Sequence, residues 1–157
     1  AAGLYPWRTI AANVKLPLEI MGYSKEEQLK RVTRVLDLVE LSGFEKKFPW
    51  QLSGGMQQRA SIARALAFDA DILLMDEPLA ALDPQTIQML QNIIVTLQTE
   101  YNLTILLTDH QARDLLVVCD KAVILSNTKI VAEGTPSELM NNENAHKHYF
   151  GKNFKFK

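Results

Sequence analysis

The sequence predicts an α/β protein in which an all-helical first third precedes a mainly parallel sheet. Apolar residues recur at helical spacing in the first third, whereas the short apolar runs 72–75 and 103–107 are typical of strands. Helical periodicity separates these two runs. A strand, a crossover helix and a second strand form a right-handed unit with parallel strands, so both strands should end at the same edge of the sheet.

Helices account for the first third of the chain. Residues 9–21 form a first helical segment, in which Pro17 should start or kink a helix. Ser24 opens a capping-box pattern, and the helix that follows should end at Ser42-Gly43. A third helix should begin after Ser53.

Small and apolar residues should form the inner face of this third helix. That face consists of Met56, Ala60, Ala63 and Ala67. Arg59 and Arg64 fall off the face and are free to point elsewhere. The small side chains should allow another element to pack closely.

The rest of the chain alternates between strands and helices. The run 72–75 is continuously apolar, which is typical of a strand buried on both faces of a parallel sheet. Asp83 is an N-cap with Pro84 at the first helical position. The inner stripe of that helix consists of Ile87, Leu90, Ile94 and Leu97.

Shorter elements follow His110. A helix should extend through Val118, and residues 122–125 and 129–133 should pair as a hairpin. Thr135 should then cap a last helix.

Length and composition bound the class of protein. A chain of 157 residues, of which 47% are apolar, is long enough for one domain with a real core. A net charge of -1 gives no electrostatic reason to expect nucleic acid or an anionic membrane as a partner. No signal-peptide pattern opens the chain, and its longest apolar runs fall far short of the roughly 20 residues that span a bilayer. We therefore expect a cytoplasmic protein.

Cysteine and histidine spacing predicts neither a disulfide nor a zinc site. Cys119 is the only cysteine, so no internal disulfide can form. His146 and His148 flank Lys147 near the end of the sequence and are expected in a solvated tail.

Polar residues follow both predicted strands where the strands end. Asp76 and Glu77 close the first strand, and Thr108-Asp109-His110 closes the second. Open α/β sheets bind ligands beyond the carboxyl ends of their strands, so these groups should converge on a site. Two adjacent carboxylates repel each other there, which is tolerable when a cation compensates the charge.

The start of the third helix offers a second polar feature. Ser53, Gly54 and Gly55 would present a hydroxyl and bare N–H groups at a helix N-terminus, where phosphate oxygens bind well. Glycines at early helical positions disfavour the helix, so a purely structural role leaves them unexplained.

Four motifs together resemble those of the ATP-binding cassette (ABC) ATPases. Residues 52–59 read Leu-Ser-Gly-Gly-Met-Gln-Gln-Arg, and Asp76-Glu77-Pro78, Asp83 and His110 follow in the family's order. The resemblance covers essentially all of the chain. It implies an α/β fold of the P-loop NTPase type, present in part as a helical subdomain and the C-terminal part of a mainly parallel sheet core.

The resemblance assigns a role to each candidate residue. Asp76 would hold Mg²⁺, and Glu77 would orient or deprotonate the water that attacks the γ-phosphate of ATP. His110 matches the family's switch histidine, which contacts that phosphate. The nucleotide-binding set is Ser53, Gly54, Gly55, Met56, Gln57 and Asp83. Met56 stands where the family's commoner signature has glutamine, and Gln57 follows it.

One part of such a domain is missing from the sequence. None of the seven glycines has a second glycine five residues on, so no Gly-x-x-x-x-Gly-Lys-Ser/Thr loop exists. The family's Q-loop glutamine and adenine-stacking aromatic are absent too. We expect one partial domain over 1–157, the C-terminal part of a longer cassette, with the signature subdomain at about 9–68 and the α/β part at about 69–157. The chain alone should hydrolyse ATP negligibly.

The resemblance also implies partners. In the family, the signature serine and glycines of one subunit face the nucleotide held by another, in a head-to-tail dimer. The expected partners are therefore a second ABC ATPase subunit and transmembrane permease subunits, with ATP and Mg²⁺ as ligands and no nucleic acid. The expected function is transport-coupled ATP hydrolysis at the inner face of the cell membrane.

The two halves of the chain resemble different transporters. Leu4-Tyr5-Pro6-Trp7 and Phe48-Pro49-Trp50 are similar to ATPases of nitrate, sulfonate and taurine importers. Thr108-Asp109-His110, Glu133-Gly134-Thr135-Pro136 and Tyr149-Phe150-Gly151 resemble the lipopolysaccharide-export ATPase. In the family the helical lobe docks the membrane subunit, which favours the importer. A soluble ABC ATPase lacks support, because the chain has no basic patch and no second cassette. A noncatalytic fragment that binds a full-length partner is a further alternative.

Overall fold

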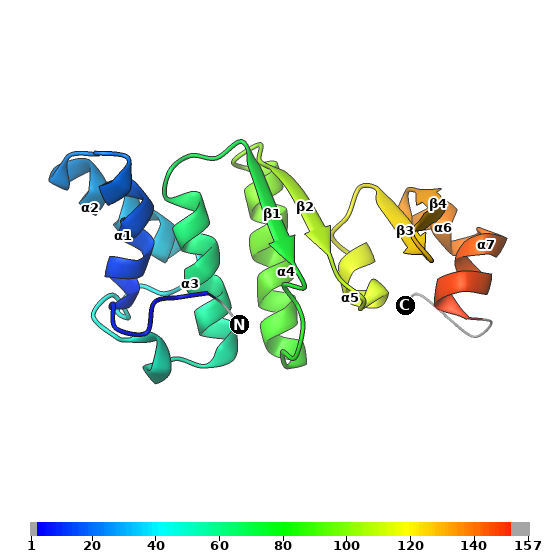
Figure 1. The fold of residues 1–157 in the computed structure, drawn as a ribbon, viewed down its shortest axis with the longest axis horizontal. Coiled ribbons are helices and arrows are strands. Elements are labelled where there is room, and N and C mark those ends of the chain that lie inside the picture. The colour runs from blue at the N-terminus through cyan, green and yellow to red at the C-terminus, as the bar shows by residue number, and fades with distance from the viewer. Residues whose placement is uncertain (1–2, 152–157) are drawn as a thin grey trace.

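The computed structural model describes residues 3–151. Their elements lie in three groups along the long axis of the molecule (Figure 1). Helices of the first third lie at one end, a strand pair backed by a long helix lies in the middle, and a hairpin with short helices lies at the other end. None of the helices within these residues is long and apolar enough to cross a membrane.

Helices build the first group. They are α1 (Ile10–Ile20), α2 (Lys25–Leu38), the 3-10 turn η1 (Pro49–Gln51) and α3 (Gly54–Leu66). Side-chain oxygens of Thr9, Ser24 and Ser53 cap the three α-helices by accepting hydrogen bonds from backbone N–H groups of the first turn. The helices predicted after Ser24 and Ser53 are thus confirmed.

One boundary in this group differs from the prediction. Pro17 lies inside α1, so of the two predicted roles only the kink remains, as a prediction. α2 ends at Leu38, short of the predicted end at Ser42. The helix stops because Glu40 adopts a left-handed φ of 55°, and Leu41 N then donates to Leu36 O at 2.8 Å. This bonding pattern is the usual way in which a left-handed residue closes a helix.

Arg59 is buried, so the prediction that it is free to point elsewhere is wrong. Its side chain donates to the backbone oxygens of Val39 at 2.8 Å and Glu40 at 3.1 Å. These acceptors lie at the end of α2, where carbonyl groups have lost their helical partners. Burial lowers the pKa of Arg59, and the charge of Glu40 acts in the opposite direction. Arg59 therefore ties α3 to the end of α2.

The middle group is a parallel strand–helix–strand unit. β1 (Ile72–Asp76) and β2 (Thr104–Thr108) pair in parallel, and α4 (Pro84–Thr99) connects them. Ile72 is in register with Thr104, and Asp76 with Thr108, so the two strands end level. The predicted connection is confirmed, as is the N-cap Asp83, whose carboxylate accepts from Thr86 N at 3.0 Å.

One face of β1 is exposed, although a strand buried on both faces was expected. Leu73 and Met75 are buried, but Ile72 and Leu74 are 64% and 65% exposed. Successive side chains of a strand point to opposite faces, and α4 lies behind only one face of the pair (Figure 1). Within residues 3–151 the other face has no helical layer over it, so its apolar side chains meet solvent.

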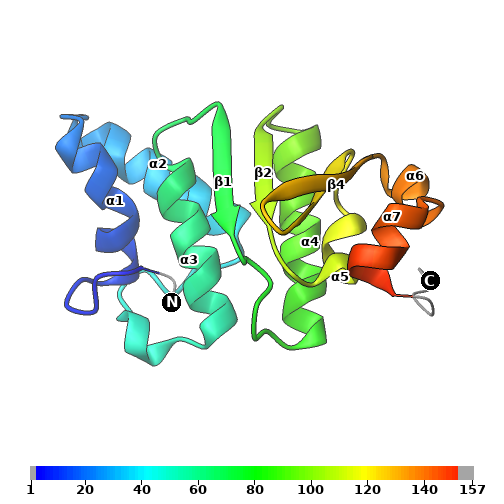
Figure 2. The same cartoon turned by 45° about the vertical axis from the view of Figure 1, so that its right-hand side comes forward.

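The third group follows β2. It consists of α5 (Ala112–Leu116), β3 (Ala122–Ser126), β4 (Lys129–Gly134), α6 (Pro136–Met140), α7 (Glu143–Ala145) and the π-helical turn η2 (His146–Phe150). β3 and β4 pair antiparallel, which confirms the hairpin, and Thr135 caps α6 in a capping box with Glu138. α5 stops short of the predicted end at Val118. Figure 2 shows the hairpin beside α5 and these short helices.

Within the described residues, the buried apolar side chains form two clusters. The larger includes Ile10 and Leu36 from the helical group and Leu90 from α4, so it crosses the predicted boundary near residue 68. The smaller cluster holds the third group together through Leu116, Ile124, Ala132, Leu139 and Ala145. The division into a signature subdomain and an α/β part stays a prediction.

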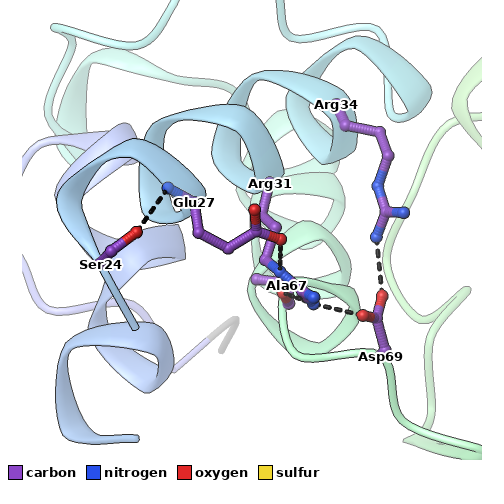
Figure 3. Close-up of polar contacts among 6 residues, drawn as sticks. All are labelled: Ser24, Glu27, Arg31, Arg34, Ala67 and Asp69. Atoms are coloured by element: carbon purple, nitrogen blue, oxygen red, sulfur yellow. Dashed lines mark hydrogen bonds and ion pairs between the residues drawn. The ribbon is translucent and has the colours of Figure 1, made fainter. Parts of the chain in front are cut away.

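An ion-pair network joins α2 to the segment before β1 (Figure 3). Arg31 Nε donates to Glu27 Oε1 at 2.6 Å, and Arg31 Nη1 donates to the Asp69 carboxylate. Arg34 Nη2 donates to the other Asp69 oxygen at 2.8 Å. Asp69 has a left-handed φ of 51°. The network therefore holds the turn from which the chain enters β1.

Candidate functional site

The predicted polar residues lie side by side at the carboxyl ends of β1 and β2. Asp76 and Thr108 are register partners, and the Thr108 hydroxyl donates a hydrogen bond to Asp76 Oδ1. Both residues are exposed to solvent. The hydroxyl orients the Asp76 carboxylate at the edge of the sheet and leaves it accessible to a ligand.

Glu77 follows in a strained backbone conformation. Its φ is 46°, in the left-handed region that costs a non-glycine residue on the order of 1–3 kcal/mol. Its N–H donates to Thr108 O at 2.7 Å, so β2 holds the point where the chain leaves β1. The turn brings Glu77 Oε1 to 3.5 Å from Nδ1 of His110. The predicted convergence of Glu77 and His110 is therefore observed.

Asp109 anchors the loop that carries His110. Its side chain is 0% exposed, although it adjoins the open edge of the sheet. Oδ2 accepts from Leu79 N at 3.3 Å, and Oδ1 accepts from Gln111 N at 2.9 Å. One buried carboxylate thus joins the loop after Glu77 to the loop after β2. Asp109 was predicted only as one of the polar residues at the strand end, although an aspartate there can accept hydrogen bonds from local backbone N–H groups.

The start of α3 has the geometry expected of a capped helix. Ser53 Oγ accepts from Met56 N at 3.3 Å. The side-chain amide of Gln57 donates back to Leu52 O at 3.2 Å. Ser53 and Gly54 are exposed. The Ser53 hydroxyl proton is still able to donate to an anion, because the cap uses only the oxygen as an acceptor.

Gly55 contacts the start of α4. A methyl group at position 55 would lie 2.3 Å from Cγ2 of Thr86, so only glycine fits without a shift. Thr86 in turn donates from Oγ1 to Asp83 Oδ2 at 2.6 Å. This hydrogen bond, together with the one from Thr86 N, lowers the pKa of Asp83. The predicted nucleotide-binding residues Gly55 and Asp83 therefore belong to one packed junction, in which Thr86 is the residue that sequence reasoning missed.

A cleft of about 650 Å³ lies between α3 and the end of β1. From α3 it is lined by Gly54 and Gln57, and from the strand end by Asp76 and Glu77. Of the predicted site residues within 3–151, those outside the lining are Ser53, Gly55, Met56, Asp83 and His110. The cleft thus brings amide groups and two carboxylates of one chain together.

The residues present fit Mg²⁺ bound together with a phosphate. Mg²⁺ takes oxygen ligands and keeps several waters, so one or two carboxylates suffice when phosphate oxygens supply the rest. Asp76 is an exposed carboxylate oriented by Thr108, and Glu77 follows it. Among residues 3–151 no group of three or more acidic, histidine or cysteine side chains could hold a metal by itself. Asp76 would hold the ion together with phosphate oxygens of the substrate.

Residues 2–80 match the protein family described as "ABC transporter". The methionine import ATP-binding protein MetN of Streptomyces avermitilis is 44% identical over 133 residues, which are 85% of this chain and 38% of MetN. The glycine betaine/carnitine transport ATP-binding protein GbuA of Listeria monocytogenes is 44% identical over 138 residues, which are 88% of this chain and 35% of GbuA. The chain thus spans well under half the length of these curated relatives.

A solved structure shows the same fold. The dimeric bacterial ABC transporter cassette MJ0796 has a TM-score of 0.76 and 33% identity to this chain. The match covers 86% of this chain and 60% of that cassette. The same cassette has also been solved in a post-hydrolysis state bound to ADP and Pi.

Proposed function

The chain belongs to the ABC transporter family, and we propose that it provides the hydrolytic part of the ATP-binding subunit of a membrane transporter. Its fold is part of the ATPase cassette of that family. The observation that carries the proposal is the contact of Glu77 with His110 beside Asp76, at the carboxyl ends of two parallel strands. A cleft reaches this edge from the start of α3.

Each residue at the edge has a chemical task in the proposed reaction. Glu77 orients the attacking water and accepts its proton. A general base must lie within hydrogen-bond distance of the proton that it takes. His110 faces Glu77 and contacts the γ-phosphate, since an imidazole donates with one nitrogen and accepts with the other. Asp76 would hold Mg²⁺, which would neutralise charge on the phosphate oxygens.

The start of α3 serves the phosphates of a nucleotide in the proposed assembly. Ser53 offers a hydroxyl, and among residues 3–151 no side chain or neighbouring element comes within 4 Å of a methyl group placed on Gly54. A helix N-terminus attracts anions through its N–H groups and dipole. We assign Ser53, Gly54, Gly55, Met56, Gln57 and Asp83 to the nucleotide held by a second ABC ATPase subunit in a head-to-tail dimer. That MJ0796 is a dimeric cassette supports this partner.

The direction of transport is proposed to be import. MetN and GbuA are named for the import of methionine and the transport of glycine betaine and carnitine. They favour an importer of a small organic solute over a lipopolysaccharide exporter. The narrower proposal, an importer of the nitrate, sulfonate or taurine type, rests on the first half of the sequence. Permease subunits would place the protein at the inner face of the cell membrane.

Steady-state ATP hydrolysis tests the proposal. The two samples are this chain alone and the same chain joined to an upstream segment that carries a Gly-x-x-x-x-Gly-Lys-Ser/Thr loop, here termed the complete cassette. We expect Mg²⁺-dependent turnover only in the complete cassette. A complete cassette with its loop lysine changed to alanine is the control for contaminating ATPases.

Other outcomes would contradict the proposal in different ways. Turnover by the chain alone would mean that its phosphate site does not depend on such a loop. A complete cassette that binds ATP but does not hydrolyse it would reject the hydrolytic role. The noncatalytic alternative is that the chain acts only by binding a full-length partner. The test is to measure the ATPase activity of the complete cassette while the chain is titrated into it.

A further inference from the structure

The C-terminal turn of the described chain reaches the residue that faces Glu77. The hydroxyl of Tyr149, in η2, donates a hydrogen bond of 2.7 Å to the backbone oxygen of His110. The two residues are 39 positions apart in the sequence. Burial, and to a smaller degree the charge of Asp109, raise the pKa of Tyr149. The hydroxyl therefore keeps its proton and remains a donor at neutral pH.

The turn that carries Tyr149 is itself well braced. The rings of Tyr149 and Phe150 lie edge to face with centroids 5.6 Å apart, and His146 and Phe150 meet in the same way at 5.6 Å. The His146 ring nitrogens lie 3.1 Å from Gly151 O and 2.7 Å from Met140 O. Phe150 also packs against the smaller apolar cluster. The turn that carries Tyr149 is thus held in place by these contacts.

The backbone of His110 is consequently held on two sides. On one side Asp109 is buried and joined to the loop after Glu77 through Leu79 N. On the other side Tyr149 holds the carbonyl group. The His110 side chain is 67% exposed, and its Nδ1 lies 3.5 Å from Glu77 Oε1 and 3.7 Å from Asp109 Oδ1. Its distance to Glu77 therefore depends on how firmly its backbone is held.

We propose that η2 positions His110 against Glu77 through the Tyr149 hydroxyl, so that the C-terminal turn is a working part of the hydrolytic edge. The proposal rests on the function proposed above. Tyr149 is a positioning residue, because its hydroxyl bonds to the backbone oxygen of His110 and acts through that residue. It links the state of the C-terminal turn to the geometry of the site.

NMR of this chain tests the positioning without any turnover. In Tyr149→Phe, which removes only the hydroxyl, we expect the His110 amide and ring signals to shift and broaden. Tyr101→Phe is the matched control, since Tyr101 is 46% exposed, close to the 40% of Tyr149. Unchanged His110 signals in Tyr149→Phe, or equal changes in both variants, would overturn the positioning.

Turnover by the complete cassette tests whether the positioning serves hydrolysis. Loss of one hydrogen bond of this kind should lower kcat of Tyr149→Phe roughly 2- to 10-fold. The KM for ATP should stay within about 2-fold of the wild-type value, because Tyr149 is expected to make no contact with the nucleotide. Wild-type kcat and KM in Tyr149→Phe would reject the catalytic use of the contact. An inactive wild-type cassette would instead reject the proposed function, whereas the NMR result would still decide the positioning.

Discussion

Gly55 lies so close to Thr86 that a methyl group at position 55 would come within 2.3 Å of Thr86 Cγ2. Thr86 cannot rotate freely out of the way, because Oγ1 is bonded to Asp83. Gly55→Ala should therefore lower the free energy of unfolding by about 1–3 kcal/mol, the usual cost of overpacking. Urea denaturation followed by circular dichroism measures the change.

Thr86→Ser in the Gly55→Ala background should restore most of the lost stability. Serine lacks the clashing methyl group and keeps the hydroxyl that bonds to Asp83. Gly54→Ala is the control for helix propensity, since no neighbouring element of the described chain lies within 4 Å of a methyl group there. It should leave stability unchanged or raise it by up to about 1 kcal/mol. Equal losses for Gly54→Ala and Gly55→Ala would contradict the close packing.

Asp109→Ala should destabilise the chain, even though Asp109 lies beside the open edge of the sheet. The change leaves Leu79 N and Gln111 N without their buried acceptor, which costs about 1–3 kcal/mol in the free energy of unfolding. Asp71→Ala is the control, because Asp71 is exposed. If urea midpoints of the two variants agree, Asp109 is not the link between the two loops.

Glu77→Gln in the complete cassette should abolish hydrolysis and preserve ATP binding. The amide keeps the shape of the side chain but loses the base and the charge, so kcat should fall about 10²- to 10⁴-fold. Nucleotide affinity is measured by fluorescence with a labelled ATP analogue, and turnover by phosphate release. Unchanged turnover would remove Glu77 from its role.

Ser53→Arg should block hydrolysis in the dimer and spare nucleotide binding by the monomer. The long side chain would stand at the exposed start of α3, where the second subunit's nucleotide is proposed to lie. Sedimentation with ATP measures dimer formation, and equilibrium dialysis measures binding. Loss of binding by the monomer would show that Ser53 acts within its own chain.

Acidification should weaken the junction between α2 and β1. Burial alone would raise the pKa of Asp69, but the hydrogen bonds and charges of Arg34 and Arg31 outweigh it, so the pKa lies below its ordinary value. A lowered pKa in the folded state adds stability above the unfolded value of about 4, and that stability is lost as pH falls through the folded value.

Asp69→Asn therefore should cost stability at pH 7 and cost nothing well below pH 4. Asp69 is 52% exposed, so each pair contributes only about 0.2–1 kcal/mol. Thermal unfolding of both proteins across this pH range provides the comparison. A difference that is independent of pH would assign the effect to packing instead of charge.

The sequence predicted the order and type of the main elements because caps and periodicity are local signals. Ser24, Ser53 and Asp83 each cap a helix as expected. Arg59 was misjudged because its acceptors lie just beyond the end of α2, and that end depends on the left-handed Glu40. A weak signal existed, since Arg59 precedes the buried Ala63 by one helical turn.

The candidate site was predictable only where polar residues directly follow the ends of predicted strands. The convergence of Glu77 and His110 follows from parallel strands of equal length. The supports of these residues were not predictable, because Thr86 and Tyr149 act through contacts between separate elements. The exposure of one face of β1 was likewise not predicted, because an apolar run in the sequence does not show which faces of the strand are covered.

The parallel register of β1 and β2 has a consequence for how the protein folds. Asp76 and Thr108 are 32 positions apart in the sequence, and α4 lies between them. Contacts between distant residues form slowly, because the loop-closure entropy is lost before the contacts form. Backbone hydrogen bonds within each helix of the first third join residues close in sequence, so helical structure should form earlier during refolding. Glu77 and His110 would then meet only in the last kinetic phase, so recovery of their contact should lag behind recovery of helical circular dichroism.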